Sequence, residues 1–76
     1  MPHVIVKLWP GPSEKQKAAL AQEIVTAIGT TVGSAEESVS VAIEEVPSRE
    51  WMAKVYRPEI APAMERLYKK PGYAPF

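Results

Sequence analysis

Residues 3–9 read HVIVKLW, and the alternation of their side chains decides the fold that the sequence predicts. Val4, Val6 and Leu8 fall on one face of an extended chain, because successive side chains of a strand point to opposite sides. The opposite face is itself half apolar. We therefore predict a strand over His3–Trp9 that meets protein on both of its faces.

A helix is predicted to follow this strand. The turn Pro10–Pro12 ends the strand, since proline lacks the donor that a ladder needs. Ser13 and Gln16 have the spacing of a capping box, in which each residue satisfies a backbone donor of the other. Gly33 is the expected left-handed cap at the far end of the helix. Apolar residues recur between these limits at helical spacing: Leu20, Ile24, Ala27 and Ile28.

A second alternating stretch predicts a second strand over Val39–Glu45. The order strand, helix, strand implies a crossover connection that leaves the two strands parallel. The predicted fold class is therefore α/β (α+β), a β-α-β unit with a parallel two-stranded sheet and a C-terminal helix. We expect residues 1–76 to form a single domain.

The region after the second strand is predicted to be helical. Ser48 begins a short helical turn that continues toward Tyr56. Pro58 suits the first position of another helix, which Pro71 and the following glycine end. The tail Tyr73–Phe76 is aromatic, and we expect it either to pack on a neighbouring subunit or to fray.

The predicted unit is too small to enclose a core by itself. One helix over two strands leaves one sheet face bare and two edges open. The chain is 46% hydrophobic over 76 residues and has no cysteine, so no disulfide can add stability. We expect a homo-oligomer, at least a dimer, whose sheets join across the subunit interface.

Charge and hydropathy exclude several classes of function. Nine basic and nine acidic residues are interleaved, which argues against nucleic-acid binding, since that needs a basic face. No apolar run approaches the roughly 20 residues of a membrane span. The residues 1–4 lack the features of a signal peptide, so we expect a cytoplasmic protein. His3 is the only histidine and cannot build a zinc site by itself, and we expect no metal or cofactor.

Pro2 is the candidate catalytic residue. Proline is common at position two without any catalytic role, but removal of Met1 would leave a secondary amine directly before a strand. A terminal amine titrates about one unit above neutrality, and apolar walls or nearby cations would lower its pKa toward working pH. A base of that pKa suits proton transfer. The chain has no cysteine, no aspartate and one histidine, so nucleophile–base–orienter triads are nearly excluded.

Short motifs along nearly the whole chain carry a resemblance to a known family. They are MPHVIVK at 1–7, SEKQK at 13–17, SVSVAIEE at 38–45, EIAP at 59–62 and KKPGY at 69–73. In this order and spacing the chain resembles the 4-oxalocrotonate tautomerase family. The last two motifs resemble a dimeric bacterial branch of it.

The resemblance implies a dimer of β-α-β units, with a hexamer as the alternative. It also implies that Pro2 is the general base of a keto–enol tautomerase acting, without a cofactor, on small 2-oxo or enol acids such as phenylpyruvate. A bulky aromatic side chain lines the family's pocket shortly after the second strand, and Trp51 stands there. Trp51 can equally be a core or interface residue.

The chain departs from the best-known members at two positions. Those members bind a substrate carboxylate with one arginine before the first helix and another in the second strand, where Pro12 and Ser40 stand here. Turnover of a dicarboxylate is therefore not expected. Arg49 and Arg57 are the candidate replacements, since arginine binds a carboxylate through two parallel hydrogen bonds. Two lysines, Lys7 and Lys54, are weaker candidates, and solvated surface charge is the alternative for all four.

Two other functions fit the same residues. A charged prolinium could act as a general acid beside an activated water, giving hydration or hydrolytic dehalogenation, with Glu44 or Glu45 positioning the water. The second alternative is a non-enzymatic oligomeric interaction module, which the missing arginines favour.

Overall fold

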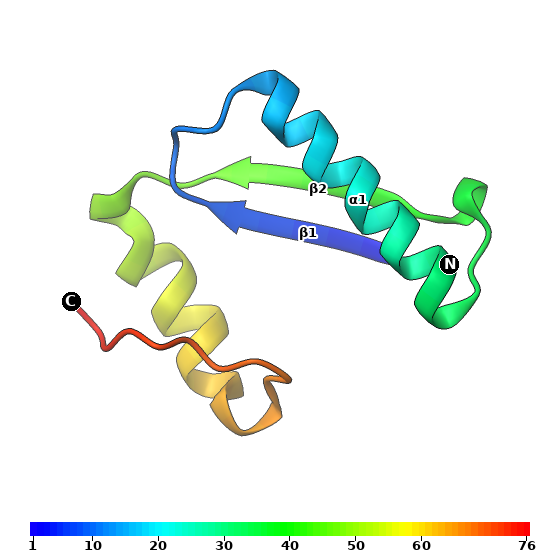
Figure 1. The fold of residues 1–76 in the computed structure, drawn as a ribbon. Helices are drawn as coiled ribbons and strands as arrows, with labels where there is room; N and C mark the ends of the chain where they lie inside the picture. The colour runs from blue at the N-terminus through cyan, green and yellow to red at the C-terminus, as the bar shows by residue number, and fades with distance from the viewer. The chain divides into compact units, whose positions relative to one another are not determined.

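Two parallel strands form the sheet of the first part of the chain. They are β1 (His3–Leu8) and β2 (Ser40–Glu45) in the computed structural model, which describes residues 1–76. Their arrows point the same way in Figure 1. The predicted parallel pairing is confirmed, although Trp9 and Val39 lie just outside the strands.

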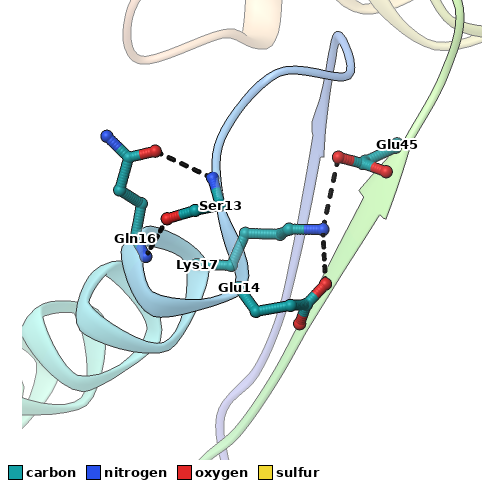
Figure 2. Close-up of polar contacts among 5 residues, drawn as sticks. All are labelled: Ser13, Glu14, Gln16, Lys17 and Glu45. Carbon is teal, nitrogen blue, oxygen red and sulfur yellow. Dashed lines mark hydrogen bonds and ion pairs between the residues drawn. The ribbon is translucent and has the colours of Figure 1, made fainter.

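The helix between these strands, α1 (Glu14–Val32), crosses one face of the sheet (Figure 1). At its start the hydroxyl of Ser13 accepts a hydrogen bond from the Gln16 amide at 3.1 Å. The side-chain oxygen of Gln16 accepts one from the Ser13 amide at 2.8 Å (Figure 2). At its end Gly33 has φ 75°, the left-handed conformation that glycine adopts without steric cost. Both predicted helix ends are confirmed, and a short helical turn, η1 (Glu36–Ser38), then leads into β2.

The unit Met1–Glu45 keeps no side chain fully away from water. Val4 and Val6 are half-buried, in agreement with a face that α1 covers, whereas Ile5 on the opposite face is 50% exposed. A single helix covers only one of the two faces of the sheet. The expected oligomer, which would cover the second face, stays a prediction.

The second compact unit, Val46–Phe76, is largely helical. It contains three successive helical segments: η2 (Ser48–Glu50), η3 (Met52–Ile60) and η4 (Ala61–Arg66). The prediction of a new helix beginning at Pro58 is wrong, because this residue lies inside η3. The expectation that residues 1–76 form a single domain stays a prediction.

The prolines explain why this run is not a regular α-helix. Pro58 and Pro62 have no amide hydrogen and cannot make the backbone hydrogen bonds of a helix interior. The turn of η3 is widened to the π type, so that the amide of Ala61 donates to the carbonyl of Tyr56, five residues earlier. After Pro62 the turn tightens into the 3₁₀ geometry of η4, which ends at Arg66 rather than near Pro71.

The core of the second unit consists of three side chains on one side of η3. Met52, Val55 and Tyr56 are the buried residues of the protein. Their spacing of three and four residues is that of a helical face, so they form one stripe. No helix of the structure combines the length and the apolar character needed to cross a membrane.

An ion-pair network ties the start of α1 to the end of β2 (Figure 2). The ammonium of Lys17 lies 3.0 Å from a carboxylate oxygen of Glu14 and 3.2 Å from one of Glu45. The Lys17 side chain is only 17% exposed. The hydrogen bonds that it makes to Glu14 and then to Glu45 raise the pKa of Lys17 above its ordinary value of 10.5.

This network predicts a pH-dependent contribution to stability. Because the pKa of Lys17 is higher in the folded state, its contribution is fully present below pH 10.5 and is lost as pH rises through the folded value. We expect Lys17→Gln to lower the free energy of unfolding below pH 10.5 and to have a smaller effect well above it, as measured by urea denaturation at fixed protein concentration. Lys15→Gln, an exposed lysine of the same turn, is the control and should show no such pH-dependent difference. Equal effects of the two variants at every pH would contradict the prediction.

Candidate functional site

Pro2 is held by the sheet although it lies outside β1. The backbone amide of Ser40 donates a hydrogen bond to the carbonyl oxygen of Pro2 at 3.1 Å, so the ladder extends one residue beyond the strand. Pro2 is half-buried, whereas Met1 is fully exposed. This hydrogen bond anchors the residue that directly precedes the predicted strand.

The chemistry of Pro2 depends on Met1. While Met1 is attached, the nitrogen of Pro2 belongs to a tertiary amide whose lone pair is delocalised into the carbonyl. That nitrogen neither donates nor accepts a proton. Once Met1 is absent, the same nitrogen becomes a secondary amine and can do both.

A second contact joins the same two strand ends. The Nδ1 atom of His3 lies 2.6 Å from the hydroxyl oxygen of Ser40, its partner in the register of the sheet. Ser40 therefore contacts Pro2 through its backbone and His3 through its side chain. The family resemblance places an arginine at this position, and the structure places there a residue that binds the start of the chain.

The other predicted site residues belong to the second unit. Trp51 stands between η2 and η3 and is half-buried. Its indole N–H donates a hydrogen bond to the hydroxyl of Tyr73 at 2.9 Å. The ring of Tyr73 also lies 5.8 Å from that of Tyr56, tilted by 50°, a favourable aromatic arrangement. Tyr73 is thus fixed on its own unit rather than frayed.

The two candidate arginines are exposed. Arg49 is in η2 with a side chain that is 83% exposed, and its guanidinium lies 4.0 Å from a carboxylate oxygen of Glu50. The same carboxylate pairs with Lys54, whose hydrogen bond lowers the pKa of Glu50 below its ordinary value. Glu50 is therefore only a weak partner for Arg49. Arg57 is exposed on η3.

Three residues that contact the candidate site residues within their own units were not predicted from the sequence as functional. His3 and Ser40 are polar residues at the same end of two parallel strands. The predicted parallel pairing of these strands could therefore have indicated that the two side chains meet. Tyr73 lies 22 residues after Trp51, and no local pattern indicates that the two residues meet. No group of three or more His, Cys, Asp or Glu side chains could hold a metal ion.

Comparisons with known proteins find tautomerases as relatives of this chain. The sequence pattern of the family described as "Tautomerase enzyme" matches residues 2–59. A probable tautomerase of Xylella fastidiosa is 45% identical over 73 residues, which cover 96% of this chain and 89% of that protein. Tautomerase PptA of Cronobacter sakazakii is 45% identical over 74 residues, covering 96% and 97% of the two chains.

A solved structure shares the fold. TomN, a 4-oxalocrotonate tautomerase homologue of the tomaymycin biosynthetic pathway, superposes with a TM-score of 0.64 at 36% identity. The superposition covers 66% of this chain and 77% of TomN. The β-α-β architecture predicted above is therefore that of 4-oxalocrotonate tautomerase homologues.

The contact between Trp51 and Tyr73 can be tested directly. Tyr73→Phe removes one hydroxyl and leaves the ring, so the indole N–H loses its partner while the aromatic packing stays. We expect the free energy of unfolding to fall by about 0.5–1.5 kcal/mol, the usual net value of one hydrogen bond. We also expect the indole proton of Trp51 to exchange faster with solvent, as followed by NMR.

Tyr68→Phe is the matched control, because Tyr68 is fully exposed. It removes the same hydroxyl group and should change neither quantity. An unchanged indole resonance of Trp51 in Tyr73→Phe would show that the hydrogen bond is absent in solution.

Proposed function

This chain belongs to the tautomerase enzyme family, and we propose that it is a cofactor-independent isomerase, a keto–enol tautomerase with Pro2 as its general base. One observation carries the proposal: the hydrogen bond that extends the sheet to Pro2, the residue at which the family match begins. Most chain ends fray, and a frayed end cannot hold a base in a fixed place. A residue that is both anchored and able to expose a ring amine suits proton transfer.

The proposed reaction moves one proton and changes no oxidation state. With Met1 removed, the neutral amine of Pro2 accepts the enol hydroxyl proton, or in the reverse direction a proton next to the carbonyl. The prolinium then returns a proton to the other end of the enol system, which yields the keto acid and restores the neutral amine. Apolar surroundings would hold the pKa of this amine near working pH, where such a base is most effective.

We propose that the second unit supplies the substrate-binding residues, with a small aromatic 2-oxo acid such as phenylpyruvate as the substrate. The indole N–H of Trp51 is already used by Tyr73, so what Trp51 offers a substrate is its apolar ring. Arg49 and Arg57 are the cations proposed to bind the carboxylate and to stabilise the developing oxyanion. Pro12 and Ser40 stand where the resemblance places arginines, which favours a monocarboxylate over a dicarboxylate.

We also propose that the active form is a homodimer. The support is the exposure of apolar side chains in a single chain: Ile5 and Trp9 are each 50% exposed. A β-α-β unit with one covered face is stabilised by burying the other face.

The role of Pro2 predicts the outcome of one substitution. Pro2→Ala, with Met1 removed and its removal verified by intact mass, replaces a rigid secondary amine by a flexible primary one. We expect the rate of phenylenolpyruvate ketonisation to fall by about 10²-fold or more, as for loss of a positioned base.

Pro75→Ala, the same change in the exposed tail, is the control and should keep the full rate. Equal rates in native protein and Pro2→Ala would rule out Pro2 as the general base. No ketonisation even by correctly processed native protein would favour an interaction module.

The role of the arginines predicts a second kinetic result. Arg49→Lys and Arg57→Lys keep the charge but lose the planar fork that binds a carboxylate through two hydrogen bonds. We expect at least one of them to raise KM for phenylenolpyruvate by about tenfold, in keeping with the loss of one charge-assisted hydrogen bond.

Arg66→Lys, at the end of η4, is the control for the general effect of exchanging a guanidinium for an ammonium. If all three variants keep the native KM, neither Arg49 nor Arg57 binds the carboxylate.

A further inference from the structure

A polar pair occupies the end of the sheet from which Pro2 projects. His3 and Ser40 are direct partners in the parallel register, and their side chains meet at 2.6 Å between Nδ1 and Oγ. This distance is short for a side-chain hydrogen bond. The proposed reaction does not use the pair.

Ser40 holds two successive residues of the chain start at once. Its backbone amide donates to the carbonyl oxygen of Pro2, and its hydroxyl contacts the imidazole of His3. Ser40 therefore binds the carbonyl of the peptide group between Pro2 and His3 and also the side chain of the residue that follows that group.

This fixation matters because of the chemistry of a chain end. Once Met1 is absent, the ring of Pro2 is rigid, and ψ of Pro2 is the only backbone torsion between the amine and the sheet. The direction of the amine lone pair then depends on the orientation of the following peptide group together with ψ of Pro2. Proton transfer requires that direction to be held within narrow limits.

The pair acts on Pro2 through the backbone. Side chains of successive strand residues leave opposite faces, so the imidazole of His3 points away from the side that carries the ring of Pro2. The hydroxyl of Ser40 faces the imidazole.

We infer that the Ser40–His3 pair is a positioning device that sets the direction of the Pro2 amine. The inference rests on the proposed role of Pro2 as the base. It also assigns a positioning role to Ser40, which stands where the resemblance places a substrate-binding arginine.

The test is a pair of substitutions at Ser40 in the full-length, processed protein. Ser40→Ala removes the hydroxyl and keeps the backbone amide, whereas Ser40→Thr keeps a hydroxyl. We expect Ser40→Ala to lower kcat for phenylenolpyruvate by about five- to tenfold with KM unchanged, and Ser40→Thr to restore most of the loss. Both quantities are measured well below the unfolding midpoint of each variant, because a loss of folded protein would itself lower the apparent kcat at unchanged KM. A substitution that only weakened the fold would keep the native kcat under those conditions.

His3→Leu removes the other partner and allows a double-mutant cycle. If the pair acts as a unit, the double variant Ser40→Ala/His3→Leu has the same kcat as either single variant, whereas independent roles would multiply the losses. Ser38→Ala is the control, because its hydroxyl donates a hydrogen bond to the carbonyl of Ala35, the residue just before η1, and not to Pro2 or His3.

A readout that does not need activity separates this inference from the proposed function. The heteronuclear NOE of the His3 amide reports order at the chain start, and it should fall in Ser40→Ala but not in Ser38→Ala. Full kcat and an unchanged NOE in Ser40→Ala, with Pro2→Ala inactive, would overturn the positioning role alone. An active Pro2→Ala would instead overturn the proposed function, while the NOE would still report whether the pair orders the chain start.

Discussion

The parallel pairing of β1 with β2 is the constraint on which the rest of the first unit depends. It begins with the Ser40 amide bonded to the Pro2 carbonyl and ends where Glu45 reaches Lys17 of α1. A parallel pair needs a crossover connection, so the length and caps of α1 have to match the sheet that it spans. The capping box at Ser13 and the left-handed cap at Gly33 set that length.

The same pairing leaves the unit Met1–Glu45 without a buried core of its own. Two strands and one helix bury no side chain fully, and Ile5 stays half exposed on the uncovered face. The second unit differs, because Met52, Val55 and Tyr56 are buried around η3 and Tyr73 closes over Tyr56 and Trp51. Stability within a single chain is thus concentrated in the helical unit, while the sheet that anchors Pro2 has more to gain from association.

The sequence was most informative where the pattern is local. The alternation around Val4 and the spacing of Ser13 and Gln16 depend on neighbouring residues, and both predictions are confirmed. The interpretation of Pro58 was wrong because a proline in a helix interior is costly, and a widened turn that accommodates it has no sequence signature. Contacts across long separations, such as that of Trp51 with Tyr73, cannot be read from periodicity. The candidate site follows the same division: Pro2 was proposed from the sequence, and its contact with Ser40 and that of Ser40 with His3 were not.

A base on the backbone depends on the fold more directly than a base on a side chain. A side-chain base reaches its target through several rotatable bonds, each of which local packing has to fix. With Pro2 as the base, the ring removes those bonds, and the register of the sheet takes over their role. A slip of one residue would bring another residue opposite His3 and turn each side chain of β1 to the other face. In such an enzyme, the interactions that maintain strand register are also the interactions that aim the base.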